Sequence, residues 1–424
     1  MKSVATAANL ISPSGILDAS SAPYHGLSHD LITALRASVA DAHLADDEDV
    51  MLGVELAAMQ PGNDTSLKHS ILMVAVGLQI AKAQGLTSIN GDSSGIFAQL
   101  VSLVAPQLEA VGFAKTKSSA ETGANQLLKN VSKAKSPLIA SAPSFAPIVI
   151  NDGTAYIGNL YLYKTKLAEN IKRIAQNKLG KAELSKATSM LAKVETMQRL
   201  DQEGVRSQAK ISEEQKDAVL KSIGGGITLI TGGPGTGKTT IVVTILRLLL
   251  RLGLTPDEIA CATFTGRAAF RMKEVICNSL DTASAIDPAD QTLVEMMDTH
   301  APKTIHRLLN STFDSSKFRS NKVSRLGAKW IVVDEASMID LQLGYRLLQA
   351  LPDDANLIIL GDVDQLPPVG AGRPFADLIY EASTSVTSGI KLVRLTENYR
   401  MQHKDTAGYN ILKIAEKINA GTPD

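Results

Sequence analysis

A glycine-rich segment lies between two apolar runs and has the residue types that bind nucleotide phosphates. Its residues are Gly232, Gly233, Pro234, Gly235, Thr236, Gly237, Lys238, Thr239 and Thr240. They satisfy the pattern G-x-x-x-x-G-K-[ST] between a strand-like and a helix-like run, the setting that a phosphate-binding loop requires. Glycines let backbone N–H groups point at phosphate, Lys238 would reach the β- and γ-phosphates, and Thr239 would ligate Mg²⁺. The structural alternative is a glycine-rich turn that caps a helix.

Two adjacent acids supply the second part of such a site. Asp334 and Glu335 follow the apolar residues 330–333. Asp334 would hold Mg²⁺ through water, and Glu335 would orient or deprotonate an attacking water. Because a small-molecule kinase needs no water-activating glutamate, the pair favours nucleotide hydrolysis. Paired acids at a strand end are also a common helix N-cap signal. The pair therefore indicates a nucleotide site only in combination with the phosphate loop.

Two glutamines could complete the site. Gln365 follows a third apolar run, at the carboxyl edge where open α/β sheets bind ligands. Its amide could hydrogen-bond the γ-phosphate and register its loss, although an Asp/Gly turn has the same composition. Gln215 stands in a helix-capping context upstream of the phosphate loop and could read the edge of an adenine. Alone, such a residue is usually a surface glutamine.

The elements that must position these residues form an α/β pattern. From residue 211 onward, apolar runs at 227–231, 258–264, 330–335 and 356–362 alternate with helix-like segments. Apolar strands that alternate with helices indicate a parallel sheet buried on both faces. Upstream, residues 25–60 and 65–110 have helical spacing, and Pro and Ser punctuation precedes short strand-like runs near 148–163. We therefore expect a parallel sheet flanked by helices, preceded by a small, mainly helical N-terminal domain.

Composition and charge limit the functional classes. The chain has 424 residues, too many for one hydrophobic core, and its 43 Lys and Arg balance its 43 Asp and Glu. Residues 1–60 carry a net charge of −6 (two basic, eight acidic), and residues 161–210 carry +6 (eleven basic, five acidic). The basic stretch could meet phosphate or an acidic partner, or it could be a solvated helix face. The two cysteines do not form a disulfide framework. The longest apolar window, 71–81, is shorter than the roughly 18–20 residues of a membrane span, so we expect a cytoplasmic protein without membrane contact.

A series of motifs resembles the superfamily-one DNA helicases. In chain order they are Glu214-Gln215, the phosphate loop, TFTGRAA (263–269), TIHRLL (304–309), VVDEASMID (332–340), GDVDQLPPV (361–369) and ENYR (397–400). They are most similar to the RecD family, the alpha subunits of exonuclease V, the RecBCD helicase–nuclease. The resemblance is dense over 211–401 and weaker over the strand-rich stretch upstream.

The resemblance implies a P-loop, RecA-like ATPase that uses ATP and Mg²⁺ to move 5′-to-3′ on single-stranded DNA. It also implies action at duplex ends, in double-strand break repair and recombination, together with RecB-like and RecC-like subunits. Thr265, Gly266, Arg267, Thr304 and His306 are implied to face DNA. Each has a structural alternative: Thr304 is a good helix N-cap, His306 could be a packed helix residue, and Arg267 could close a turn.

The catalytic set implied by the resemblance consists of Lys238, Glu335, Gln365 and Arg400. Arg400 would reach the γ-phosphate from across an inter-domain cleft, where a planar and permanently charged group suits the spreading charge of the transition state.

The expected organisation follows from these motifs. We expect a helical domain over 1–140 that docks partner subunits, a connector of short strands and basic helices over 141–210, a RecA-like ATPase domain over 211–390, and the start of a second RecA-like domain over 391–424. A loop or hairpin near 310–328 could be a strand-separating pin or a surface loop. Because family members continue further, we expect the 424 residues to be a fragment. A stand-alone helicase of the same subgroup and a nucleotide-binding assembly subunit remain as alternatives.

Overall fold

The chain divides into two units with separate hydrophobic cores. The computed structural model describes residues 26–92, 94–113, 120–144, 146–195, 198–200, 206–208, 211–280, 288–311, 318–385, 389–397 and 417. The units are Met1–Tyr161 and Leu162–Asp424, and the division falls within helix α7 (Gly158–Ala175).

The first unit packs helices together with a small sheet. Its described helices are α1 (His29–Asp41), α2 (Asp47–Ala58), α3 (Thr65–Ala83), α4 (Ile96–Leu103), α5 (Ala105–Ala110) and α6 (Ala120–Lys133). Helix α3 is buried along most of its length because it packs against α2, α4 and α6. The expected mainly helical N-terminal domain is therefore confirmed.

The strands of the first unit form a sheet of order β1-β4-β3-β2. They are β1 (Ser88–Ile89), β2 (Ile139–Ala140), β3 (Ile148–Asn151) and β4 (Thr154–Ile157). Asp152 and Gly153 join β3 to β4 with φ of 48° and 74°, the two left-handed residues that a tight hairpin favours. Ile148, Ile150 and Ala155 belong to the core of this unit, although they lie within the 141–210 stretch that was expected to be a connector.

The second unit is built on a parallel sheet of order β12-β7-β11-β10-β8-β9. Its strands are β7 (Ile227–Gly232), β8 (Ile259–Thr263), β9 (Lys303–Thr304), β10 (Trp330–Asp334), β11 (Asn356–Gly361) and β12 (Ile390–Leu395). The four apolar runs of the sequence are β7, β8, β10 and β11, so the predicted parallel sheet is confirmed.

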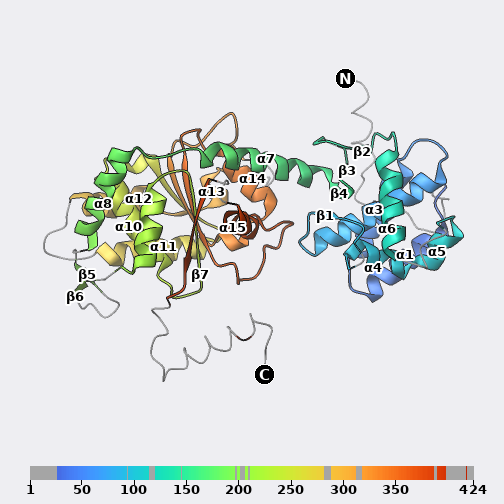
Figure 1. The fold of residues 1–424 in the computed structure, drawn as a ribbon, viewed down its shortest axis with the longest axis horizontal. Helices are drawn as coiled ribbons and strands as arrows, with labels where there is room; N and C mark the ends of the chain where they lie inside the picture. Colours follow the sequence, from blue (N-terminus) through green and yellow to red (C-terminus); the bar gives the residue numbers. More distant parts are fainter. Residues whose placement is uncertain are drawn as a thin grey trace. The chain divides into compact units, whose positions relative to one another are not determined.

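Helices cover both faces of this sheet, with α10, α11 and α12 on one side and α14 and α15 on the other (Figure 1). The helices are α8 (Lys181–Glu195), α9 (Glu213–Ile223), α10 (Lys238–Arg251), α11 (Gly266–Leu280), α12 (Pro288–Thr299), α13 (Ile305–Leu308), α14 (Leu341–Ala350) and α15 (Pro374–Thr384). Val332 and Ile358 share a core with the first group, whereas Val333 and Ile359 face α7, α14 and α15. Strand alternation thus explains why the runs are apolar throughout.

Short elements complete the second unit. They are the 3-10 turns η1 (Pro256–Glu258) and η2 (Ala336–Met338) and the antiparallel pair β5 (Gln198–Leu200) and β6 (Arg206–Gln208). No helix in the described part of the chain is both long enough and apolar enough to cross a membrane.

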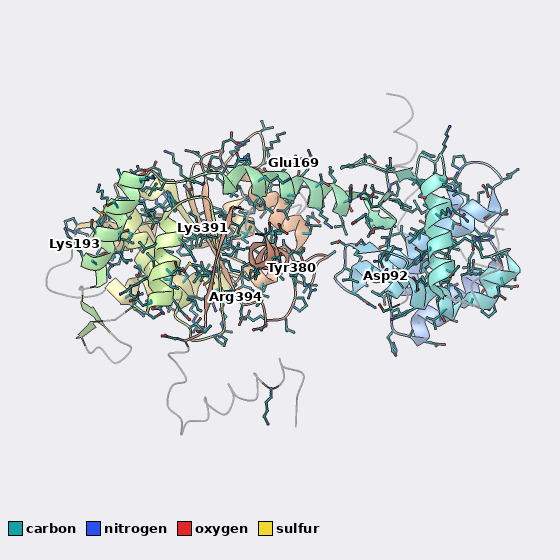
Figure 2. All side chains as sticks on the ribbon, in the orientation of Figure 1. Asp92, Glu169, Lys193, Tyr380, Lys391 and Arg394 are labelled. Carbon is teal, nitrogen blue, oxygen red and sulfur yellow. The ribbon has the colours of Figure 1, made fainter. Side chains whose placement is uncertain are left out.

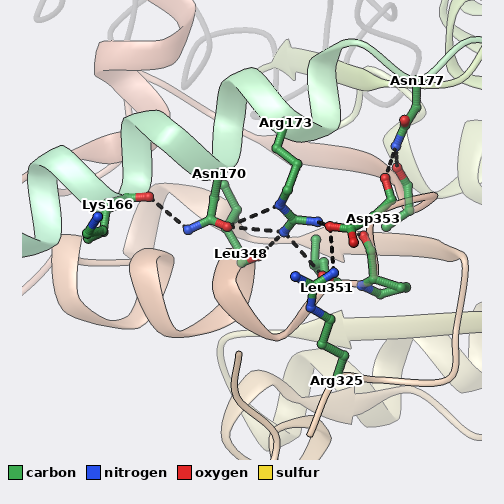
Figure 3. A network of polar contacts seen from close by, with 10 residues as sticks. Lys166, Asn170, Arg173, Asn177, Arg325, Leu348, Leu351 and Asp353 are labelled. Carbon is green, nitrogen blue, oxygen red and sulfur yellow. Dashed lines mark hydrogen bonds and ion pairs between the residues drawn. The ribbon is translucent and has the colours of Figure 1, made fainter. Parts of the chain in front are cut away.

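Helix α7 is fastened to the end of α14 by Arg173 (Figure 3). The guanidinium donates to the carbonyl oxygens of Leu348 (3.0 Å), Leu351 (3.1 Å) and Pro352 (2.9 Å), and to the Asp353 carboxylate (2.9 Å). The last carbonyls of a helix lack helical partners, so a cation there satisfies them and opposes the helix dipole. This contact makes the second half of α7 part of the second unit.

Strand β12 is an edge strand that carries Lys391 and Arg394 (Figure 2). It pairs in parallel with β7 and so belongs to the sheet of the second unit, whereas the sequence predicted that a following domain begins at residue 391. Lys391 donates from Nζ to the carbonyl oxygens of Lys221 (3.1 Å) and Gly225, at the C-terminal end of α9. Burial, and secondarily the charge of Lys178, lowers the pKa of Lys391 to about 8. Helix α9 and strand β12 are therefore tied together at this end.

Candidate functional site

The candidate site lies at the carboxyl ends of four adjacent strands, in the order β7, β11, β10 and β8. The phosphate loop follows β7, Gln365 follows β11, Asp334 and Glu335 end β10, and Thr265 follows β8. Ligands of open α/β sheets bind at this edge, because the loops after parallel strands meet there.

The phosphate loop joins β7 to α10 and turns at two glycines. Gly235 has φ 86° and Gly237 has φ 82°, backbone conformations that side chains with a Cβ rarely adopt. Between them Thr236 is buried, and its hydroxyl donates to the Gly233 carbonyl (2.9 Å). A Cβ added at Gly233 would meet no atom within 4 Å. The loop is therefore held from inside and has open space beside Gly233.

Lys238 begins α10, and its side chain folds back over the loop. Its Nζ donates to the carbonyl oxygens of Gly232 and Gly233, the second at 2.9 Å. Thr239 and Thr240 follow in the first turn of α10 and are partly exposed. An ammonium held by carbonyls at a helix N-terminus can exchange them for phosphate oxygens without a large movement.

Asp334 is the last residue of β10 and is partly buried. Its Oδ1 accepts a hydrogen bond from the Glu335 backbone N–H (2.8 Å). Burial raises the pKa of Asp334, while that hydrogen bond and the charge of Lys238 act in the opposite direction. Asp334 and Lys238 therefore interact, as a metal-binding acid and a phosphate-binding lysine would.

Glu335 has a strained backbone. Its φ is 56°, in the left-handed region, which costs a residue other than glycine about 1–2 kcal/mol. Burial and the adjacent Asp334 raise the pKa of Glu335, while the Thr265 hydroxyl and the charge of Arg271 lower it. A carboxylate with a raised pKa at a strand end has the properties of a general base.

A serine connects Gln365 to the acidic pair. The Ser337 hydroxyl donates to Gln365 Oε1 (3.4 Å), and Ser337 belongs to the η2 turn that follows Glu335. The Gln365 N–H donates to the Asp362 carbonyl (3.3 Å), so the Asp/Gly turn of the alternative reading is also present. Ser337 was not among the residues singled out from the sequence, because a serine after two acids carries no distinctive signal.

Gln215 is buried and bound within the protein. Its Oε1 accepts from the Ser212 backbone N–H (3.2 Å), and its Nε2 donates to the Thr236 carbonyl (3.2 Å). The alternative of an exposed surface glutamine is wrong for this residue, which is only 4% exposed. Its amide holds the phosphate loop in this conformation. To hydrogen-bond the edge of an adenine, Gln215 would have to break one of these two hydrogen bonds.

Thr265 connects the candidate DNA motif to the acidic pair. Its hydroxyl donates to Glu335 Oε2 (3.4 Å) and accepts from the Ala268 backbone N–H (3.2 Å), the pattern of a helix N-cap for α11. Gly266 and Arg267, the next two residues, are exposed. The motif thus presents Arg267 to solvent while Thr265 points at a candidate catalytic carboxylate.

Thr304 and His306 lie at the other edge of the sheet, where β9 pairs with β8. The Thr304 hydroxyl accepts from the Arg307 backbone N–H (3.2 Å) and caps α13. The His306 ring lies 5.9 Å from the ring of Phe318 and is partly buried. Both structural alternatives, an N-cap and a packed helix residue, are therefore present, and a DNA contact stays a prediction.

Two expectations fall on residues that the structure does not describe. Arg400 lies outside the described residues, as do positions 312–317 of the expected hairpin. The described ends of that hairpin, Ser311 and Phe318, form an antiparallel bridge.

A divalent cation fits the donors at this edge. Among the described residues, no group of three or more His, Cys, Asp or Glu side chains could hold a metal. Mg²⁺ requires fewer, because it binds through one or two carboxylates or hydroxyls and completes its shell with water and phosphate. Asp334 and Thr239 supply donors of that kind.

Sequence comparisons connect this site to known proteins. Residues 215–371 match the AAA domain family. The RecBCD enzyme subunit RecD of Mycobacterium tuberculosis is 38% identical over 216 residues, which are 50% of this chain and 35% of that protein. The ATP-dependent RecD2 DNA helicase of Deinococcus radiodurans is 34% identical over 195 residues, which are 46% of this chain and 22% of that protein. The chain thus matches about a third or less of the length of these relatives.

A structural comparison gives a more distant likeness. The Pif1 helicase from Candida albicans has 17% sequence identity and a TM-score of 0.30, over 50% of this chain and 45% of that chain.

Proposed function

We propose that this chain is the ATP-hydrolysing part of a RecD-like, superfamily-one DNA helicase, which its similarity to the AAA domain family, to RecD and to a RecD2 helicase supports. The observation that carries the proposal is the meeting of Lys238, Asp334, Glu335 and Gln365 at the carboxyl ends of β7, β10 and β11. An AAA domain implies the use of a nucleotide, and we take that nucleotide to be ATP with Mg²⁺.

The site residues divide the work of hydrolysis. Backbone N–H groups of the phosphate loop and Lys238 bind the β- and γ-phosphates. Asp334 and Thr239 would hold Mg²⁺, which would supply positive charge to neutralise the phosphates. Glu335 orients and deprotonates the attacking water, since its carboxylate is close to Asp334 and has a raised pKa. Gln365 senses the γ-phosphate with an amide that the Ser337 hydroxyl helps to position.

DNA would be bound beside this site. Arg267 is exposed at the start of α11 and suits a DNA phosphate, as do backbone groups at Gly266. The Thr265 hydroxyl contacts Glu335, which supports a direct path from bound DNA to the water-activating carboxylate. Thr304 and His306 extend the surface along the edge strand, and Arg400 is assigned to the γ-phosphate by the resemblance alone.

The relatives favour a role inside a larger complex. RecD is named as a subunit of the RecBCD enzyme, so we propose RecB-like and RecC-like partners, single-stranded DNA and duplex ends as substrates, and 5′-to-3′ movement in break repair. We assign partner docking to the helical first unit. The second candidate is a stand-alone helicase, which the similarity to a RecD2 helicase favours. A pull-down from a cell extract distinguishes them, because only the first recovers the large RecB-like and RecC-like partners.

Steady-state ATP hydrolysis with and without single-stranded DNA tests the proposal. We expect turnover that DNA stimulates, and loss of both rates in Lys238→Gln. Turnover that is the same in Lys238→Gln as in the unaltered chain would overturn the site assignment. Stimulation that is unchanged in Arg267→Ala would remove Arg267 from the DNA-binding surface.

A further inference from the structure

The carboxylate of Glu214 binds the chain where it leaves β12. It accepts from the Thr396 backbone N–H (2.8 Å) and from the Thr396 hydroxyl (2.6 Å). Thr396 directly follows Leu395, the last β12 residue paired with β7. The carboxylate therefore satisfies a backbone donor that the sheet leaves without a strand partner, and it fixes the direction in which the chain leaves the sheet.

The next residue of the same helical turn holds the phosphate loop. Gln215 donates from Nε2 to the Thr236 carbonyl (3.2 Å), and its Oε1 accepts from the Ser212 N–H (3.2 Å). Two consecutive residues at the start of α9 thus hold two loops that are about 160 positions apart in sequence. One of these loops would contact nucleotide.

The strand ends that lead into the two loops lie side by side. Gly232 pairs with Leu395, and a Cβ added at Gly232 would lie 2.9 Å from Leu395 Cβ and 2.8 Å from Thr236 Oγ1, closer than real Cβ atoms approach their neighbours. The far end of α9 is fixed to β12 by Lys391, which donates to the carbonyl of Lys221 (3.1 Å). Both ends of α9 are therefore held by hydrogen bonds to neighbouring segments. We expect a displacement of the phosphate loop to be transmitted to the first turn of α9.

We propose that Glu214 is a positioning residue that couples the phosphate loop to the chain leaving β12 at Thr396, through the first turn of α9. This rests on the proposed ATP hydrolysis. Thr396 directly follows the strand that pairs with β7, so the coupling would fix the position of the phosphate loop relative to the end of β12.

Electrostatics support an ionised Glu214. The hydrogen bonds from Thr396, together with that from the Glu397 backbone, lower the pKa of Glu214. Glu213 stands in the same helical turn, but its side chain is 90% exposed and pairs with Lys216 (2.9 Å). Both carboxylates lie in the first turn of α9, where a negative charge interacts favourably with the helix dipole. Glu213 is therefore a matched control for charge and helix stability.

The first test separates catalysis from nucleotide binding. We expect Glu214→Ala to lower kcat for ATP at least about tenfold with KM changed less than about twofold, since misplacement of catalytic groups acts on the chemical step. Thr396→Val should reproduce part of this fall, because valine keeps the backbone N–H but loses the hydroxyl, and Thr396→Ser should keep most of the rate, because serine keeps both donors. Glu213→Ala should match the unaltered chain. Equal kinetics for Glu214→Ala and Glu213→Ala would overturn the proposal.

The second test measures coupling without turnover. Hydrogen exchange, followed by mass spectrometry, reports protection of the backbone around Leu392–Glu397 with and without a non-hydrolysable ATP analogue. We expect the analogue to slow exchange there in the unaltered chain and in Glu213→Ala, but not in Glu214→Gln, a milder variant if Glu214→Ala fails to fold. If the analogue binds Glu214→Gln and protects Leu392–Glu397 as much as in the unaltered chain, the coupling is refuted. If the analogue does not bind the unaltered chain, the proposed function is refuted instead.

Discussion

Arg173→Ala should loosen the contact between α7 and α14. The guanidinium satisfies three carbonyl oxygens and the Asp353 carboxylate, and its side chain is 23% exposed. Each abandoned acceptor costs about 1–3 kcal/mol where water cannot replace the donor, but partial exposure lets water reach some of them. We therefore expect a loss of about 3 kcal/mol, which corresponds to a fall in Tm of about 6–12 °C for a unit of this size.

The assay is thermal unfolding followed by circular dichroism, with three variants compared. Arg173→Lys should lose most of the same stability, because an ammonium cannot span acceptors that a planar fork reaches together. Lys166→Ala, on the same helix, removes an exposed pair with Glu169 and should cost less than about 1 kcal/mol. If Arg173→Ala and Lys166→Ala melt at the same temperature, the proposed fastening of α7 is wrong.

Three further variants test the charges of the nucleotide unit. Glu335→Gln should lower kcat for ATP by about 10²–10⁴-fold, the usual contribution of a general base, and a rate within twofold of the unaltered chain would exclude that role. Asp334→Asn should raise Tm near neutral pH. Burial raises the pKa of Asp334 in the folded state above its pKa in the unfolded state, so the ionised carboxylate lowers the stability as pH rises through the folded-state pKa. That gain should vanish below about pH 4, and a gain independent of pH would contradict this origin. Asp290→Asn should cost about 3 kcal/mol, because it leaves Arg247 and Arg251 buried without their carboxylate; urea unfolding measures the loss. Burial opposes the Asp290 charge, but the two arginines lower the pKa of Asp290 overall. The stability that the Asp290 carboxylate contributes is therefore present above its unfolded-state pKa, and it should disappear as pH falls through its folded-state pKa.

The sheet and the phosphate loop were predictable because their signals are local. Continuous apolar runs indicate strands covered on both faces, and β7, β8, β10 and β11 are such strands. Gly235 and Gly237 take left-handed conformations that the glycine pattern already requires. Strand β12 was assigned to a following domain, since an edge strand that pairs with a distant segment has no signature of its own.

The contacts that make the site specific were not predictable, because they join residues far apart in sequence. Thr265 and Glu335 are 70 positions apart, and Glu214 and Thr396 are 182 apart. Nothing in residue type or spacing indicates that a threonine hydroxyl will lie against one particular carboxylate. The left-handed backbone of Glu335 is likewise imposed by its surroundings, because sequence propensity would place a glycine there.

Binding of a fluorescent ATP analogue in the presence of Mg²⁺ tests the central assignment most directly, because it depends on neither DNA nor partner subunits. The phosphate loop and the acidic pair predict that the unaltered chain and Glu335→Gln bind the analogue with similar Kd, while Lys238→Gln binds at least about tenfold more weakly, with its Tm unchanged. Equal affinity in Lys238→Gln would contradict the account, since the nucleotide would then bind somewhere other than the loop between β7 and α10.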